Sequence, residues 1–80
     1  DYWFWRDSNG NEVDLLTKKG LLFDTFEIKS SQTLLPGMFK GLDYFYNLAP
    51  DQMNNRTIIY GGDEDQERSK YRVRSWKSIL

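Results

Sequence analysis

The sequence predicts a mixed α/β (α+β) fold in which a small β-sheet packs against one helix. Three observations predict it: strand-like runs separated by turn residues before position 30, helical spacing of apolar residues after position 34, and a return to a strand-like run at 55–62. With 80 residues, 39% of them hydrophobic, the chain suffices for one core, so we expect a single domain over residues 1–80.

The first half of the chain predicts an antiparallel meander of three strands. Aromatic residues fill positions 2–5 and favour a strand, and Asn9 with Gly10 supplies the turn of a tight hairpin to the second strand. A second turn is expected at 17–20, with Gly20 at the left-handed position, and a third strand at 21–30.

The second half predicts one amphipathic helix followed by one or two further strands. The apolar positions at three- and four-residue spacing are Leu35, Met38, Phe39, Leu42, Phe45, Tyr46 and Ala49. Pro36 fits the first turn of this helix, and Pro50 lies just past its end. A strand at 55–62 would then run parallel to the third strand, because strand–helix–strand units favour that crossover. We expect a solvated loop at 63–70 and a last short strand at 71–76.

The composition excludes several kinds of chemistry. The chain has no Cys and no His, which removes disulfides, thiolate nucleophiles, imidazole bases and most zinc or copper sites. Catalysis would therefore depend on carboxylates, Lys and a hard cation. The net charge of −1 shows no overall basic footprint for nucleic acid. No apolar run approaches the roughly 20 residues that span a bilayer, so we expect no membrane and a cytoplasmic location.

Ionisable residues interrupt the two strands that should be most apolar. Side chains alternate across a strand, so Glu12 shares a face with Asp14, and Glu27 shares a face with Lys29. Pairing through the 17–20 turn would place Asp14 near the level of Glu27, about 4.8 Å away across the sheet. Two such carboxylates repel each other unless a cation lies between them.

The reaction that these four ionisable residues could catalyse depends on which face of the sheet the helix covers. We expect the helix on the other face, over the apolar residues Val13, Leu15, Phe26 and Ile28. The exposed acidic face would then suit Mg²⁺, which takes oxygen ligands, and a nearby Lys would offset charge during phosphodiester hydrolysis. The alternative is a solvated strand face whose opposite charges pair for roughly 0.2–1 kcal/mol.

Several motifs along the chain resemble a known family. Asp14, followed after a gap of twelve residues by Glu27-Ile28-Lys29, resembles the D…(D/E)-x-K signature of the PD-(D/E)XK nuclease superfamily. The segments "YWFWRDSNGNEVDLL", "FEIKSS", "KGLDYF" and "YGG" are similar to the C-terminal nuclease-like domain of prokaryotic AAA-type ATPases. The resemblance covers most of the chain, from about Tyr2 to Trp76.

This resemblance implies a restriction-endonuclease-like core that lacks its N-terminal helix, cut from the C-terminal part of a longer ATPase. It makes Asp14 and Glu27 metal ligands for Mg²⁺ or Mn²⁺, Lys29 the catalytic lysine, and Glu12 a further ligand or accessory acid. It also implies DNA as the substrate and an upstream AAA-type ATPase domain in the same chain as a partner.

Two alternatives from other functional classes stay open. One is a non-catalytic module that binds nucleic acid or a protein for the ATPase, and the other is a dimerisation domain that forms a homo-oligomer through its aromatic strands. The three Trp residues would stack on bases in the first case and pack in the core or an interface in the second. The basic residues at 68–74 would either meet phosphates or be neutralised by the acidic residues at 63–67.

Overall fold

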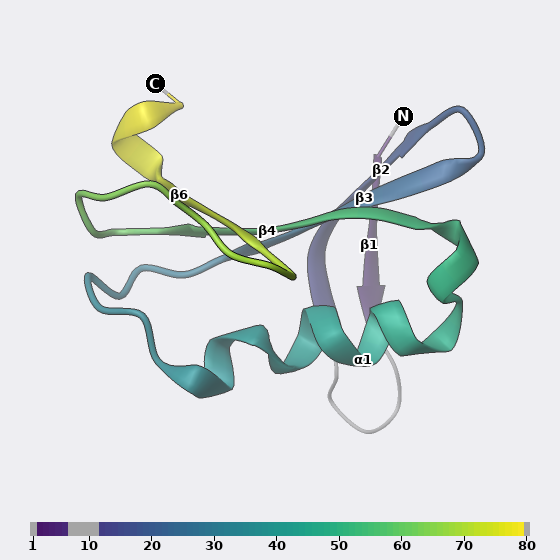
Figure 1. Cartoon of the computed structure of the whole chain (residues 1–80), viewed down its shortest axis with the longest axis horizontal. Helices are drawn as coiled ribbons and strands as arrows, with labels where there is room; N and C mark the ends of the chain where they lie inside the picture. The colour runs from purple at the N-terminus through teal and green to yellow at the C-terminus, as the bar shows by residue number, and fades with distance from the viewer. Residues whose placement is uncertain (1, 7–11, 80) are drawn as a thin grey trace.

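The computed structural model describes residues 2–6 and 12–79, with the side chains of Arg6, Glu12 and Val13 left out. In this part of the chain, six strands form one sheet, and a single α-helix with an adjoining 3₁₀ turn lies below it (Figure 1). The prediction of a mixed α/β fold is confirmed. The expected turn at Asn9 and Gly10 lies outside the described residues.

The first three strands form the predicted antiparallel meander: β1 (Tyr2–Arg6), β2 (Glu12–Lys19) and β3 (Leu22–Ile28). The expected turn at 17–20 is too long, because Lys19 still pairs with Leu22 and only Gly20 and Leu21 separate the strands. Gly20 has a φ of 65°, which a residue without a Cβ adopts at little cost. The two lysines at the end of β2 are tolerated because this end of the hairpin is exposed.

The helix begins with a tighter turn than the sequence predicts. Pro36–Phe39 is a 3₁₀ turn (η1), and the α-helix proper, α1, covers Lys40–Leu48. Pro36 stands in the first turn as expected, where its missing N–H costs nothing. A second 3₁₀ turn, η2 (Pro50–Gln52), follows directly, so Pro50 begins a new turn and the chain passes at once into the next strand.

The second half of the sheet is parallel where the crossover predicts it. β4 (Met53–Tyr60) runs parallel to β3, and β6 (Arg72–Ser75) runs parallel to β4. The predicted loop at 63–70 is partly wrong, because it contains a two-residue strand, β5 (Gln66–Glu67), that pairs with β6. The sheet order is β1-β2-β3-β4-β6-β5, and a 3₁₀ turn, η3 (Trp76–Ser78), follows β6.

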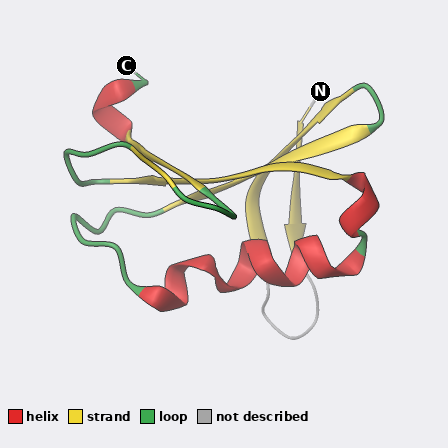
Figure 2. Cartoon of the chain, viewed as in Figure 1, coloured by secondary structure: helices red, strands yellow, loops and turns green. Residues whose placement is uncertain are grey.

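The helix covers one face of the sheet (Figure 2), and the core lies on this face. The buried apolar side chains are Leu16, Phe39, Leu42, Ile58, Tyr60 and Val73. The prediction that the helix covers the face of Leu15, Phe26 and Ile28 is therefore wrong, since Ile28 is 55% exposed whereas Thr25 and Glu27 are buried with Leu16. Both rows of β3 contain aromatic residues, so alternation alone did not distinguish the two faces.

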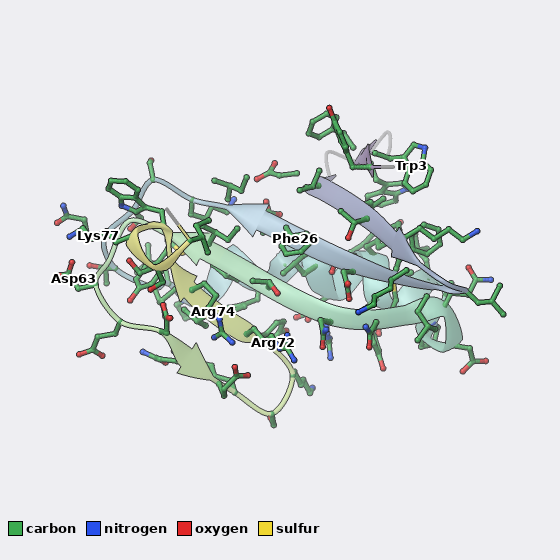
Figure 3. All side chains as sticks on the ribbon, turned by 90° about the horizontal axis from the view of Figure 1, so that it is seen from above. Trp3, Phe26, Asp63, Arg72, Arg74 and Lys77 are labelled. Atoms are coloured by element: carbon green, nitrogen blue, oxygen red, sulfur yellow. The ribbon has the colours of Figure 1, made fainter. Side chains whose placement is uncertain are left out.

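The opposite face of the sheet has no helix over it in the described part of the chain. Figure 3 looks onto this face, with Phe26 near its middle and Arg72 and Arg74 on β6. Two aromatic residues of β1 lie on it in mutual contact, because the rings of Tyr2 and Phe4 pack edge to face with centroids 6.3 Å apart. Within residues 2–6 and 12–79, no helix has the length and apolar character needed to cross a bilayer.

Candidate functional site

The pairing of β2 with β3 ends next to the predicted acidic residues. Leu15 pairs with Phe26 and Leu16 with Thr25, and the regular antiparallel register stops one residue before Asp14 and Glu27. Asp14 Oδ2 accepts a hydrogen bond from the backbone N–H of Ile28 at 2.8 Å. Because Ile28 lies between Glu27 and Lys29 in the chain, the carboxylate of β2 contacts the backbone that carries both other predicted site residues.

An irregularity in β2 accounts for the position of Asp14. Trp3 pairs with Leu16 but Trp5 pairs with Val13, so two residues of β2 oppose one residue of β1 at this point. Such β-bulges interrupt the ladder and redirect a side chain, and they occur often beside active sites. Here the carboxylate of Asp14 satisfies a backbone N–H of β3 at the place where regular β2–β3 pairing ends.

Glu27 and Lys29 form an ion pair at the border between the core and solvent. Lys29 Nζ lies 3.7 Å from Glu27 Oε2, and the two side chains are 38% and 4% exposed. A carboxylate removed from water needs a partner of opposite charge, and Lys29 supplies that charge while its amine stays within reach of solvent. Of the predicted residues, Glu27 and Lys29 thus pair with each other on the side of β3 that carries the core, and Asp14 contacts the backbone between them.

The fourth predicted residue, Glu12, has a side chain that lies outside the described residues. Among the described side chains, no group of three or more His, Cys, Asp or Glu residues is placed to hold a metal ion. Asp14 and Glu27 remain as two carboxylates with hard oxygen atoms, the ligand type that Mg²⁺ prefers. A Mg²⁺ site with only two carboxylates is chemically sufficient when water and a phosphate complete the coordination.

The sequence interpretation missed a second polar cluster, which joins α1, β4 and the start of β6. Asp43 Oδ1 accepts hydrogen bonds from the Tyr71 hydroxyl and, at 3.3 Å, from Arg56 Nη1. The Arg56 guanidinium also lies 3.9 Å from the centre of the Tyr46 ring. Burial, followed by the hydrogen bond from Tyr71 to Asp43, raises the pKa of Tyr71 to about 12. The available signal was a charged residue, Arg56, in β4 shortly before the apolar run at 58–60.

Comparison with protein families places the chain. A family model described as a domain of unknown function (DUF4143) matches residues 1–79. The chain belongs to this family. A comparison with curated proteins and another with solved structures found no match. The span matched to DUF4143 includes Asp14, Glu27 and Lys29 as well as the cluster around Tyr71. The family description states no activity, so the chemistry open to this DUF4143 domain depends on its own residues.

Proposed function

We propose that this DUF4143 domain is a Mg²⁺- or Mn²⁺-dependent nuclease domain that hydrolyses phosphodiester bonds of DNA. The single observation that supports this proposal most is the contact of Asp14 with the backbone amide between Glu27 and Lys29. It puts the Asp14 carboxylate of β2 against the backbone segment that carries Glu27 and Lys29.

The residues present fit a hard divalent cation. Asp14 accepts the Ile28 amide through Oδ2, so Oδ1 is the oxygen that would ligate an ion together with Glu27. A bound Mg²⁺ would polarise a phosphoryl oxygen and lower the pKa of a water molecule. The low exposure of the Glu27 side chain, 4%, would keep its carboxylate fixed and poorly hydrated, which strengthens its interaction with a cation.

Lys29 has a separate task in this proposal. Its ammonium group lies 3.7 Å from Glu27 Oε2, and its side chain is 38% exposed, so a phosphate can approach it from solvent. A fixed cation beside a reacting phosphate offsets the negative charge that develops during hydrolysis. Lys29 therefore binds and stabilises the phosphate, while Asp14 and Glu27 hold the ion.

The resemblance to PD-(D/E)XK nucleases supports the same assignment, because the family pattern puts metal ligands at Asp14 and Glu27 and a lysine at Lys29. It also supports an upstream AAA-type ATPase domain in the same chain and a cytoplasmic location as parts of the proposal. In this arrangement the ATPase would act on the DNA that the nuclease domain cleaves.

A second function is favoured by a different observation. Glu27 is already paired with Lys29, and the helix lies on the same face of the sheet, which also suits a site that has lost its activity. The exposed rings of Tyr2 and Phe4 would then serve a non-catalytic module that binds a protein or a second copy of the chain. Measurements of metal binding and of DNA cleavage distinguish the nuclease from the non-catalytic module.

The test is isothermal titration of Mn²⁺ and Mg²⁺ into the wild type and Asp14→Asn, together with cleavage of plasmid DNA. Asn keeps an oxygen that accepts the Ile28 amide but removes the negative charge, so the fold is preserved while a metal ligand is lost. We expect Asp14→Asn to lose both metal binding and cleavage. Asp51→Asn, an exposed carboxylate in η2, is the matched control and should behave as the wild type.

Lys29→Met tests whether the Lys29 amine acts in cleavage and not in metal binding. Removal of a charge that stabilises the transition state typically costs about 10²–10³ in rate, so cleavage should fall by this factor while Mn²⁺ still binds. Metal binding by the wild type without any cleavage would indicate an incomplete site. The absence of both would contradict the nuclease proposal and favour the interaction module.

A further inference from the structure

A hollow with an apolar wall lies between η1 and the loop 68–71 that joins β5 to β6. Its volume is about 420 Å³, within the range of sites that enclose small organic groups. The apolar lining side chains are Leu34, Leu35, Pro36 and Phe39. The remaining lining residues are Asp43 and the loop 68–71 itself. None of the predicted metal ligands contributes to this hollow.

A second, polar hollow of about 230 Å³ adjoins the first where β4 and β6 begin. Residues 68–71 line both hollows, so this loop forms their common boundary. The second hollow is also lined by Asn54, Asn55 and Arg56 from β4 and by Glu67 and Arg72. Glu67 is paired with Arg72 and Arg74, so amide groups and cations replace the apolar wall within the length of one loop.

Two cations at this boundary have no acidic partner in the described part of the chain. Glu67 pairs with Arg72 at 3.9 Å and also with Arg74, and Asp63 pairs with Lys77 at 2.5 Å. The predicted neutralisation of the basic residues at 68–74 is therefore only partly confirmed. Arg68 donates to Gln66 Oε1 at 3.1 Å, and no ion pair involves Arg68 or Lys70.

The loop holds these cations in a defined place. The backbone N–H of Arg68 donates to the carbonyl of Tyr71 at 2.9 Å and closes the turn. The Arg68 guanidinium lies 5.5 Å from the centre of the Phe39 ring, and the Tyr71 ring packs on that of Phe39 with centroids 4.4 Å apart. Arg68 is thus held against Phe39, at the aromatic end of the apolar hollow.

We propose that the two hollows together bind one nucleotide of a single-stranded nucleic acid. The flat base enters the apolar hollow beside Leu35 and Pro36, and its phosphate lies between Arg68 and Lys70. Asp43, whose Oδ1 is occupied by Tyr71 and Arg56, presents its other carboxylate oxygen as an acceptor for an amino group of the base. This site goes beyond the proposed cleavage, because it requires neither a metal ion nor Asp14.

An acidic peptide is the competing ligand, and the geometry favours it less. A peptide that adds to a sheet uses the backbone groups of an edge strand, but β5, the edge strand beside the hollows, is only two residues long. An apolar slot next to a pair of unneutralised cations matches the alternation of base and phosphate in a nucleotide.

The experiment measures fluorescence anisotropy of a labelled 20-residue oligothymidylate in EDTA, so that cleavage plays no part in the result. We expect saturable, salt-dependent binding by the intact chain. Arg68→Ala/Lys70→Ala should make the slope of log K against log salt less negative by about 1.4, since each lost phosphate contact on a single strand accounts for about 0.7. Lys18→Ala/Lys19→Ala, two exposed lysines of β2, is the charge-matched control and should leave the slope unchanged.

A second variant tests whether the base lies in the apolar hollow. Leu35→Ser removes an apolar wall residue, and Ser is a favourable residue at this N-cap, so the helix stays formed. It should weaken oligothymidylate binding by about fivefold or more but leave binding of an abasic strand unchanged. Leu48→Ser, an equally exposed leucine outside both hollows, is its control.

Three results of the binding measurements would overturn the proposal. They are no saturable binding, equal effects of the two double variants on the slope, and equal affinity of the wild type for abasic and base-containing strands. Displacement of the oligonucleotide by an equal concentration of polyglutamate would also overturn it, and would assign the site to an acidic polypeptide.

Discussion

The cluster of Asp43, Arg56 and Tyr71 shows how single residues connect the helix to the far half of the sheet. Asp43 is on α1, Arg56 on β4 and Tyr71 at the start of β6, and one carboxylate oxygen accepts from both partners. The Asp43 side chain is 45% exposed, so either donor can be lost while the other donor and water still satisfy the carboxylate. The cluster therefore stabilises the fold through bonds whose separate contributions can be measured.

Tyr71→Phe should lower the free energy of unfolding by about 1–2 kcal/mol at neutral pH, because a hydrogen bond to a charged group contributes about 1.5–3 kcal/mol and the partial exposure of Asp43 reduces this contribution. The pKa of Tyr71 is raised to about 12 from 10.0, so its contribution is complete below pH 10 and is lost as the pH rises through 12. The difference between wild type and variant should therefore shrink between pH 10 and pH 12.

Urea unfolding at a series of pH values measures this difference. Tyr46→Phe is the matched control, because it keeps the ring 3.9 Å from the Arg56 guanidinium and leaves the Tyr71 bond intact. A constant difference between the wild type and Tyr71→Phe across this pH range would show that the hydroxyl of Tyr71 does not stabilise the folded state through Asp43.

At the scale of elements, the ends of β3 and β4 determine where Lys29 lies. The backbone N–H of Lys29 donates to the Ile59 carbonyl at 2.8 Å, and that of Gly61 donates to the Ser31 carbonyl at the same distance. These two bonds continue the parallel pairing past the last residue of β3. The amine of the proposed site therefore depends on a close approach of two backbone segments.

Gly61→Ala should destabilise the fold by about 1–3 kcal/mol and also lower activity, because a Cβ at this position would lie 2.6 Å from the Ser30 carbonyl oxygen. Backbone at this point cannot move without displacing the segment that carries Lys29. Gly37→Ala is the control, since no atom lies within 4 Å of its added Cβ and alanine reduces the entropy of the unfolded chain. Thermal unfolding of both variants checks the prediction, and equal melting temperatures would contradict it.

Much of this arrangement could be predicted from local patterns. Three local patterns each favoured one conformation, and the structure contains all three. They are the aromatic run of β1, Gly20 in its turn and the periodic apolar residues of α1. The approach of Asp14 to the backbone of β3 next to Glu27 was consistent with counting residues through the hairpin. The face that the helix covers did not follow, because Phe23 and Phe26 give both rows of β3 an apolar residue and only tertiary packing selects between them.

The parts that sequence reasoning missed depend on contacts between distant residues. The two-residue β5 has no pattern of its own, and it forms because its backbone pairs with β6. Arg56 reaches Asp43 only because α1 packs against the sheet that contains β4. The bulge at Asp14 arises from a mismatch in the β1–β2 register that neither strand shows alone.

At the scale of the whole molecule, the helix covers one face of the sheet and leaves aromatic side chains exposed on the other. Leu42 of α1 is 0% exposed in the core, whereas Phe4 is 74% exposed on the open face. A domain of 80 residues has a total stability of about 4–12 kcal/mol, so a single core residue accounts for a large part of it.

Leu42→Ala should therefore cost about 2–5 kcal/mol, and Phe4→Thr should change the free energy of unfolding by no more than about 0.5 kcal/mol, because Thr also favours a strand and little packing is lost. Urea denaturation at several protein concentrations tests both variants. If the open face is packed against a second copy of the chain, Phe4→Thr will cost as much as a core substitution, and the cost will grow with protein concentration. A small cost that does not depend on concentration shows instead that one covered face is enough to hold this sheet together, which leaves the aromatic face free for a partner outside the chain.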